Sequence, residues 1–574
     1  MRMLARGGNA VDAGVAATFA AAVTEISHFG LGGEAPILLY LADRSDVVVI
    51  NGQGSAPAAA SADLFRREGR IPANGPSAGT VPALVDALAI ALAEFGTLSL
   101  SDVLAPAISL ADGFPWYDFL TRYLTPEMER MLRYPSGARV YLQGPEGTIP
   151  AVGSMFRQPD LARTLRALAQ EEQRNLRQGR KAAIYAVRDR FYRGGDIGQR
   201  IAKAVQDAGG LLTAEDLADY RGRVERPTRA GFRTRHGAFE VFKTGFWGQG
   251  PVLLQALMIL QGFDLERMGH NSTQYIHTVT EALKLALADR DTYYGDPDFA
   301  KVPATGLLSE TYAAERRKLI DPAAANNQIR PGAPWKFESP SGRGSRAPCA
   351  TTWARSSSQE RVVSVRSSAG VGSETESPDT TNINVADARG NLFSASPSSA
   401  WFFGGVFIAG DTGVPLGNRM QAFVLNEDGH PNLVQGGKRP RTTLTPTVVL
   451  REGKPFLALS SPGGDSQDQQ ALQVFLNLAV FNMRPQEAVE APRFNSLHYH
   501  ESFRTHRFRM AGGLEVENRI PPDVIAELGL RGHKVVTVGP FMMDTGTTLA
   551  GFDAEHRTVF GAADVRRQRF VTGW

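Results

Sequence analysis

The chain has 574 residues, of which 43% are hydrophobic, so it is long enough to bury a large core. Its 59 acidic residues nearly cancel its 62 basic ones, and the net charge of +3 is too small to indicate a nucleic-acid partner. The single cysteine, Cys349, excludes an internal disulfide framework, no apolar run reaches the roughly 18 residues that span a bilayer, and no signal-peptide core is visible, so we expect a globular, cytoplasmic protein without a membrane segment.

The first half of the chain is predicted to contain one hairpin and several helices. Apolar runs at 37–41 and 47–50 flank a polar turn, which is typical of a β-hairpin. Thr213-Ala-Glu-Asp216 resembles a capping box at a helix start. Helical apolar spacing is found at 84–95, 100–112 and 275–294, and an Ala- and Val-rich helix is expected at 10–23.

The composition changes over residues 329–379, where Ser, Arg, Gly and Pro dominate and no periodicity is sustained. This pattern favours an exposed, flexible segment. The chain then becomes rich in strands, with hairpins predicted at 382–396 and 445–460 and a helix at 468–482. Strands near both ends with helices between them predict an α+β layered fold rather than a regular βαβ repeat.

Thr380 lies where the flexible segment meets a predicted strand, directly after Asp379. An ordinary strand threonine is the simplest interpretation, because threonine favours strands. A second interpretation is chemical: a hydroxyl becomes a good nucleophile when a base takes its proton, and cleavage of the preceding bond would expose the residue's own α-amine as that base. The same hydroxyl could attack the Asp379 carbonyl and so make the cut.

Two further segments could serve such a nucleophile. Ser460-Ser-Pro-Gly-Gly464 follows a predicted strand and precedes a predicted helix, and paired glycines let two backbone amides approach an oxyanion. The same segment could equally be a tight loop. The hydroxyl-rich run Arg441-Thr-Thr-Leu-Thr445 could line the same pocket or simply enter a strand.

A set of motifs spread along nearly the whole chain resembles the gamma-glutamyltransferase family of N-terminal nucleophile hydrolases. Together the motifs are specific, whereas each alone would be weak. They are Gly7-Gly-Asn-Ala-Val-Asp-Ala13, Ala56-Pro-Ala58, Gly79-Thr-Val-Pro82, Leu104-Ala-Pro-Ala107 with Gly113-Phe-Pro115, Glu281-Ala-Leu-Lys-Leu-Ala286 with Ala288-Asp-Arg-Asp291, Thr380-Thr381 with Asp387 and Gly390-Asn391, Lys438-Arg-Pro440, and Ser461-Pro-Gly-Gly464.

The resemblance implies a four-layer αββα sandwich, a proenzyme cleaved between Asp379 and Thr380, and no cofactor or metal. The products would be a large subunit, 1–379, and a small subunit, 380–574, which stay together as a heterodimer; a dimer of heterodimers stays open. The resemblance also assigns roles to site residues: Thr380 as nucleophile, Ser398 as a hydroxyl near its amine, Gly463 and Gly464 as oxyanion-hole amides, and Thr442 and Thr443 at a pair of serines that hold the substrate carboxylate.

The chain departs from that family pattern where a γ-glutamyl group would be held. Gln53 stands at the position of an arginine that grips the α-carboxylate, and Ala422 at that of an acidic residue that grips the α-amine. An expected asparagine is Ala400, and a nearby glutamine is Arg419. Lost charges cost recognition of those charges. We therefore expect a small amide such as oxamate, with its carboxylate on Arg419 and Gln53 as a neutral neighbour.

Three alternatives stay open at this stage. One is a true γ-glutamyl hydrolase or transferase acting on glutathione-like substrates. A metal hydrolase would rest on His498, His500, Glu501 and His506, whose spacing fits no standard zinc motif. A catalytically inactive binding protein on the same fold is the third, although an inactive site has no physical need to keep all four of Thr380, Ser398, Gly463 and Gly464.

Overall fold

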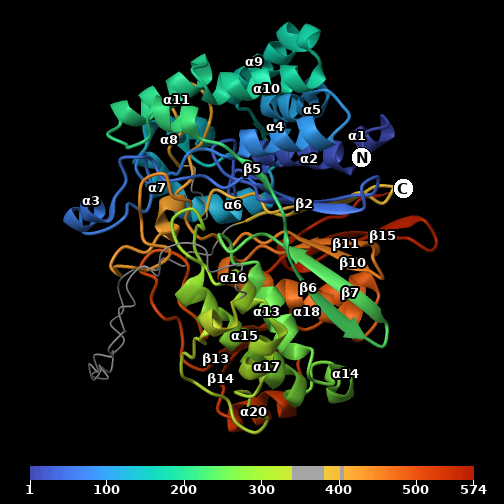
Figure 1. Ribbon diagram of the computed structural model, residues 1–574. Helices are drawn as coiled ribbons and strands as arrows, with labels where there is room; N and C mark the ends of the chain where they lie inside the picture. Colours follow the sequence, from blue (N-terminus) through green and yellow to red (C-terminus); the bar gives the residue numbers. More distant parts are fainter. Residues whose placement is uncertain (339–379, 401–405, 574) are drawn as a thin grey trace.

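The computed structural model describes residues 1–338, 380–400 and 406–573. Two β-sheets pack face to face, and helices cover the outer side of each sheet (Figure 1). The predicted four-layer αββα sandwich is therefore confirmed.

The first sheet has five strands in the order β5-β2-β1-β9-β8, and every pair in it is antiparallel. The predicted hairpins at 37–50 and 382–396 form its β1–β2 and β8–β9 pairs. Strand β1 also pairs with β9, with Ile37 opposite Ala395, so the two halves of the chain share this sheet. The strands are β1 (Ile37–Leu41), β2 (Asp46–Asn51), β5 (Arg223–Glu225), β8 (Ile383–Ala386) and β9 (Leu392–Ala395).

The second sheet has six antiparallel strands in the order β16-β15-β11-β10-β7-β6. Its strands are β6 (Thr228–Thr234), β7 (Gly237–Lys243), β10 (Thr447–Arg451), β11 (Lys454–Ser460), β15 (Thr548–Asp553) and β16 (Thr558–Ala563). Two smaller sheets consist of β12 (Phe494–Ser496), β13 (Gly513–Glu517) and β14 (Lys534–Val538), and of β3 (Phe114–Pro115) and β4 (Met155–Phe156).

The sheets are held by burial on both faces. In β1, Ile37 and Leu39 pack against the helices on the outer face of the first sheet, whereas Leu38 points into the core between the sheets. In β11, Leu459 faces the helices on the outer face of the second sheet, and Ala458 faces the core between the sheets. Successive side chains of a strand point to opposite faces of the sheet, so each of these strands contributes apolar residues to a core on either side. This explains why the segments are nearly continuous apolar runs in the sequence.

One set of helices covers the outer face of the first sheet (Figure 1). The helices predicted at 84–95 and 100–112 are confirmed. The set comprises α1 (Arg2–Ala5), α2 (Ala10–Thr24), α4 (Leu84–Phe95), α5 (Leu100–Asp112), α6 (Asp118–Leu124), α7 (Met128–Leu132), α8 (Pro135–Tyr141), α9 (Pro159–Asn175), α10 (Arg180–Tyr192), α11 (Asp196–Asp207) and α12 (Ala214–Asp219). The predicted capping box starts α12: Asp216 N donates to Thr213 Oγ1 at 3.1 Å.

A second set of helices covers the outer face of the other sheet. The helix predicted at 275–294 is its long central member, α15. The set comprises α13 (Pro251–Leu260), α14 (Leu265–Met268), α15 (Thr273–Tyr293), α16 (Ala304–Leu307), α17 (Glu310–Arg317), α18 (Gln467–Ala479), α19 (Pro485–Glu490) and α20 (Pro522–Leu530). Helix α3 (Ala62–Arg67) packs in a smaller cluster. None of the described helices is long and apolar enough to span a membrane.

The first part of the segment predicted to be exposed and flexible, residues 329–338, is instead packed against the fold. Residues 329–338 pack against α15: Arg330 lies 3.0 Å from Glu281, Gly332 N donates to Asp289 at 2.8 Å, and a 3-10 turn, η4 (Pro334–Phe337), follows. The reason is that buried carboxylates on α15 need partners. The rest of the predicted segment, 339–379 with Asp379, lies outside the described residues.

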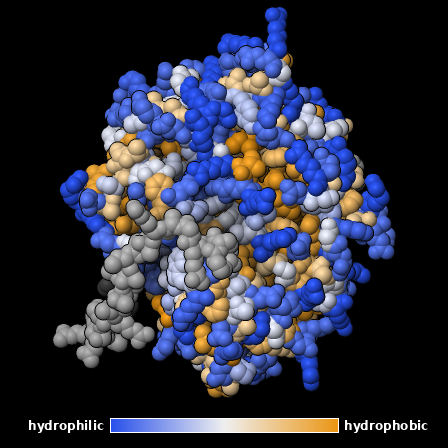
Figure 2. All heavy atoms as spheres, in the orientation of Figure 1, coloured by the Kyte–Doolittle hydropathy of each residue, from blue (hydrophilic) through white to orange (hydrophobic). Residues whose placement is uncertain are grey.

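The face of the molecule drawn in Figure 2 is mainly hydrophilic, with hydrophobic residues in smaller patches.

Candidate active site

Thr380 is buried and lies shortly before β8, which begins at Ile383. Two residues further on, Asn382 reaches across to the other sheet: its Nδ2 donates to the carbonyl of Ser460 at 2.8 Å and to that of Gly546 at 3.0 Å. These bonds join the start of β8 to the end of β11. The candidate nucleophile is therefore held beside the segment that carries the two predicted oxyanion-hole glycines.

Gln467, the first residue of α18, contacts the hydroxyl of Thr380. In the amide orientation that satisfies its neighbours, its side-chain nitrogen donates to the carbonyls of Thr443 (2.9 Å) and Ser461 (3.0 Å), and its oxygen accepts from Thr380 Oγ1 (3.2 Å). The sequence analysis missed this residue. A signal existed, since Gln467-Asp-Gln-Gln470 opens a helix with four polar residues that are all buried.

The glycine loop has the conformation that the sequence suggested. Gly463 and Gly464 have φ angles of +119° and +56°, which residues other than glycine rarely adopt. A Cβ on Gly463 would lie 2.7 Å from the carbonyl oxygen of Asp544. In the part of the chain that the structure describes, neither glycine amide donates a hydrogen bond to another residue. The loop thus offers two donors close to the candidate nucleophile, as an oxyanion hole requires.

Ser398 lies on the segment beside the nucleophile. Its backbone pairs with that of Glu34 through an isolated antiparallel bridge, and its hydroxyl accepts from the amide of Ala400 at 2.9 Å. The neighbouring Pro397 carbonyl accepts from the amide of Thr381 at 3.1 Å. A backbone hydrogen bond therefore joins the residue before Ser398 to the residue after the candidate nucleophile.

Arg419 is already paired with a carboxylate. Its Nε lies 2.5 Å from Glu34 Oε1, and each side chain is 3% exposed. Burial raises the pKa of Glu34 and lowers that of Arg419, and the pair opposes both shifts. The amide of Gly54 donates to the second Glu34 oxygen at 3.2 Å. Most of the guanidinium N–H groups make no hydrogen bond to the described residues, so Arg419 keeps donors for a further acceptor.

An apolar wall adjoins this ion pair. Ala400, Ala422 and Phe503 form one buried cluster, and the Phe503 ring lies 5.6 Å from the Arg419 guanidinium carbon. Ala400 and Ala422 occupy the positions where the sequence resemblance expects an asparagine and an acidic residue. The aromatic ring of Phe503, which the sequence analysis did not single out, packs against both alanines. A substrate ammonium group would find no carboxylate in this wall.

The remaining predicted substrate contacts, Gln53 and Thr442, are buried and already hold backbone groups. Gln53 Nε2 donates to the carbonyl of Pro440, and the backbone carbonyl of Gln53 accepts from the Tyr220 hydroxyl. Thr442 bridges to Gly248, while its Oγ1 makes no hydrogen bond within the described chain. The structure thus brings Thr443 to Gln467 and leaves Gln53 and Thr442 with one uncommitted polar atom each.

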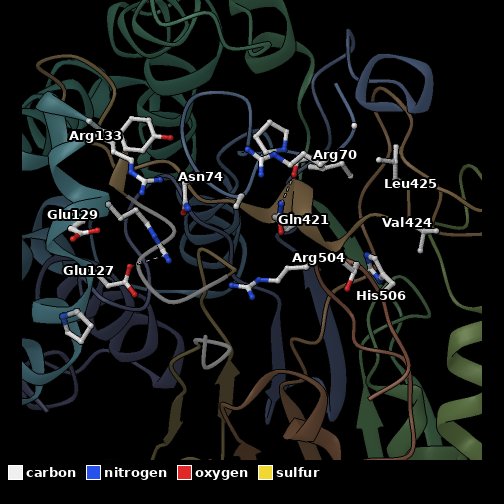
Figure 3. A pocket seen from close by; sticks show the side chains of 18 of the residues that line it. Arg70, Asn74, Glu127, Glu129, Arg133, Gln421, Val424, Leu425, Arg504 and His506 are labelled. Atoms are coloured by element: carbon white, nitrogen blue, oxygen red, sulfur yellow. Dashed lines mark hydrogen bonds and ion pairs between the residues drawn. The ribbon is translucent and has the colours of Figure 1, made fainter. Parts of the chain in front are cut away.

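A hollow of about 1460 Å³ is lined in part by residues that neighbour the apolar wall in sequence (Figure 3). One side of it is formed by Gln421 and Arg504, whose backbones are joined at 3.0 Å. Figure 3 shows Glu127 and Arg133 on the opposite side. Because Gln421 precedes Ala422 and Arg504 follows Phe503, the wall and the hollow are two sides of the same segments.

The histidines behind the metal-hydrolase alternative have separate partners. His498 Nε2 bonds to the carbonyl of Gln328, His500 faces Asp291 at 3.3 Å, and His506 bonds to the carbonyl of Phe423. Burial lowers the pKa of both His498 and His506 to about 4. Among the described residues, no group of three or more His, Cys, Asp or Glu side chains could hold a metal ion.

Comparison with known proteins identifies this arrangement. The family model described as gamma-glutamyltranspeptidase matches residues 1–574. The chain is 33% identical to the acylase ACY 1 proenzyme of Pseudomonas sp. (strain V22), over 93% of this chain and 84% of that protein. It is 31% identical to the glutathione hydrolase-like YwrD proenzyme of Bacillus subtilis, over 100% of this chain and 95% of that protein.

Solved structures agree with the sequence relatives. The structure of a cephalosporin acylase from Bacillus halodurans superposes with a TM-score of 0.79 at 27% identity, over 98% of this chain and 91% of that one. Several relatives carry the word proenzyme in their names, in keeping with a chain that is made whole and then processed into two. The chain therefore belongs to the gamma-glutamyltranspeptidase family and is an autoprocessing N-terminal nucleophile hydrolase that acts on amide bonds.

Proposed function

We propose that the chain cleaves itself between Asp379 and Thr380, giving subunits of residues 1–379 and 380–574. The Thr380 hydroxyl attacks the Asp379 carbonyl, the acyl group moves from nitrogen to oxygen, and water hydrolyses the ester to leave a free amine on Thr380. The support is the position of Thr380: it is buried, its hydroxyl bonds to Gln467, and it lies beside the glycine loop.

The same groups then perform turnover. The free α-amine takes the proton of the Thr380 hydroxyl as that oxygen attacks the substrate amide carbon, while the amides of Gly463 and Gly464 donate to the oxyanion. The leaving amine takes the proton, and an ester to Thr380 remains. Water attacks that ester to release the acid and restore the hydroxyl. Gln467 orients the hydroxyl, and Ser398 supplies a second hydroxyl near the amine.

The substrate that we propose is a small amide whose acyl part carries a carboxylate and no α-amine. The observation that carries this choice is the apolar wall: Phe503 packs on Ala422 and Ala400, so the ammonium of a γ-glutamyl group would meet apolar side chains, and the adjoining Glu34 carboxylate is already paired with Arg419. Arg419 supplies spare donors for a carboxylate. Gln53, Thr442 and Thr443 are the neutral neighbours.

A matched pair of chromogenic anilides tests this choice. The glutaryl and γ-glutamyl anilides of p-nitroaniline differ only by the α-amino group, so their ratio of kcat/KM isolates recognition of that charge. We expect kcat/KM for the glutaryl compound to be higher by at least about tenfold, because burying one unpaired polar group costs roughly the free energy that corresponds to a tenfold change. A preference for the γ-glutamyl compound would instead favour a glutathione hydrolase, the activity named for the Bacillus subtilis relative at 30% identity.

Oxamate belongs in the same panel, with ammonia release as the readout, because it is the smallest acid amide that fits the proposal. The Thr380→Ala variant is the control: it should stay uncut on a denaturing gel and turn over none of the substrates. Turnover of no amide by a correctly cut parent would favour the inactive binding protein. The cytoplasmic location expected from the sequence stays a prediction, and a dimer of heterodimers stays open.

A further inference from the structure

A buried arginine from the end of the chain touches the backbone of Thr380. Arg569 Nη2 lies 3.4 Å from the Thr380 carbonyl oxygen, and its Nη1 donates to Thr381 Oγ1 at 2.9 Å. The same Nη1 lies 3.1 Å from Glu25 Oε2, at the end of α2. The arginine side chain is 10% exposed and that of Glu25 is 27% exposed. Neither residue belongs to a motif that the sequence analysis singled out.

The arginine charge lies close to the atom that cleavage would turn into an amine. The carbonyl oxygen and the nitrogen of one residue are about 3 Å apart by covalent geometry. The guanidinium of Arg569 is therefore within about 7 Å of the Thr380 nitrogen. A positive charge at that distance disfavours a second positive charge on the amine. A base must be unprotonated to act, so this contact bears directly on catalysis.

The negative charge of Glu25 opposes the effect of the arginine charge on the Thr380 amine. Its Oε2 lies 3.3 Å from Thr381 Oγ1, one residue beyond the Thr380 carbonyl that Arg569 reaches. Burial raises the pKa of the Glu25 carboxyl, but the charges of Arg569 and His28 outweigh this and hold the pKa below its usual range. Glu25 is thus an anion at neutral pH, and it partly cancels the arginine.

Other charged side chains on the described segments that adjoin Thr380 form ion pairs of their own. Behind the neighbouring segments lie three ion pairs: Arg419 with Glu34, Lys243 with Asp468, and Arg567 with Asp544. His28 Nδ1 lies 3.7 Å from Glu25 Oε2 and belongs to the same group as Arg569. Among the described residues, the pair formed by Arg569 and Glu25 contacts the Thr380 carbonyl and the Thr381 hydroxyl directly.

We propose that Arg569 keeps the free amine of Thr380 unprotonated near neutral pH and that Glu25 limits this effect, so that the pair sets the acid side of the enzyme's pH range. This inference rests on the proposed function, because it needs a free amine on Thr380. Arg569 and Glu25 are positioning residues in this scheme: they act through the charge of the amine rather than on the substrate.

The test is the pH dependence of kcat/KM for the best anilide, measured on fully cut enzyme. A model α-amine titrates at about 7.7 to 8.0. Arg569→Gln should move the acid limb up by about one pH unit, because the anion of Glu25 then acts alone. Glu25→Gln should move it down by about the same amount. Arg569→Lys keeps the charge and should leave the limb near its parent position.

A matched control removes an arginine from a distant exposed pair. Arg235→Gln breaks a surface contact to Glu266, where the arginine side chain is 68% exposed, and should leave the limb in place. Limbs that stay fixed in both Gln variants, or that move in the same direction, would overturn the inference while leaving an active Thr380 enzyme. An uncut parent, or turnover that survives Thr380→Ala, would instead overturn the proposed function.

Discussion

Lys243 is a buried cation whose removal should destabilise the protein in a pH-dependent way. It ends β7 and is fully buried, and its Nζ lies 2.9 Å from Asp468 Oδ1. The same Nζ donates to the carbonyl of Thr445 at 3.0 Å and to Thr447 Oγ1 at 2.8 Å. Asp468 follows Gln467 directly, so the pair supports the first turn of α18 beneath the candidate nucleophile.

The expected magnitude follows from the charge that stays behind. Lys243→Met keeps most of the side-chain volume but leaves the buried Asp468 carboxylate without its cation, which costs about 3 to 5 kcal/mol of unfolding free energy. Burial already raises the pKa of Asp468 to about 6, with Lys243 opposing the rise. In the variant the pKa should rise further. A raised folded-state pKa means that stability is retained at low pH and lost as the pH rises through it.

Urea unfolding at pH 5 and pH 8 measures both effects. We expect Lys243→Met to lose much more stability at pH 8 than at pH 5, and the double variant with Asp468→Asn to recover most of the loss, because no charge is then buried. Lys203→Met is the control, since that lysine is 74% exposed in a pair with Asp207 and should matter little. Equal losses at the two pH values, or no recovery in the double variant, would refute the reasoning.

Three other predictions concern the site itself. Gly463→Ala forces a side chain against the Asp544 carbonyl and should lower kcat by about 100-fold or more through the displaced oxyanion donor, measured as initial rate on soluble, folded enzyme. Gln467→Leu removes the acceptor of the Thr380 hydroxyl and should slow self-cleavage about tenfold, followed on denaturing gels; an unchanged rate would contradict its orienting role. Arg419→Gln should raise KM for glutaryl anilide and leave that for uncharged butyryl anilide nearly unchanged; equal changes would contradict a carboxylate contact.

The regular elements could be predicted because their signals are local. The helix at 100–112 buries one face of a periodic sequence, whereas the helix at 84–95 is an almost wholly apolar run that is buried on all sides. The hairpin at 37–50 joins two apolar runs across a polar turn. The glycine loop was also predictable, since its position between a strand and a helix is written in neighbouring residues. Its positive φ angles agree with that prediction.

The polar contacts of the site could not be predicted because they join residues far apart in the chain. Glu34 meets Arg419, and Gln467 meets Thr380, only after both sheets have formed. A family resemblance suggested a free role for Arg419, but the partner that fixes it lies nearly four hundred residues earlier in the sequence. Such pairs depend on tertiary packing, which local periodicity does not encode.

The sheet topology bears on how two cut chains would stay together. The segment after Thr380 supplies β8 and β9 to the first sheet, and β9 pairs with β1 from the segment before it. In the second sheet, β7 from the segment before Thr380 pairs with β10 from the segment after it. Separating the products of the proposed cut would therefore break the backbone ladders of both sheets and expose the core between them. Dissociation and unfolding should be a single event, so the two chains should elute together until denaturant unfolds both.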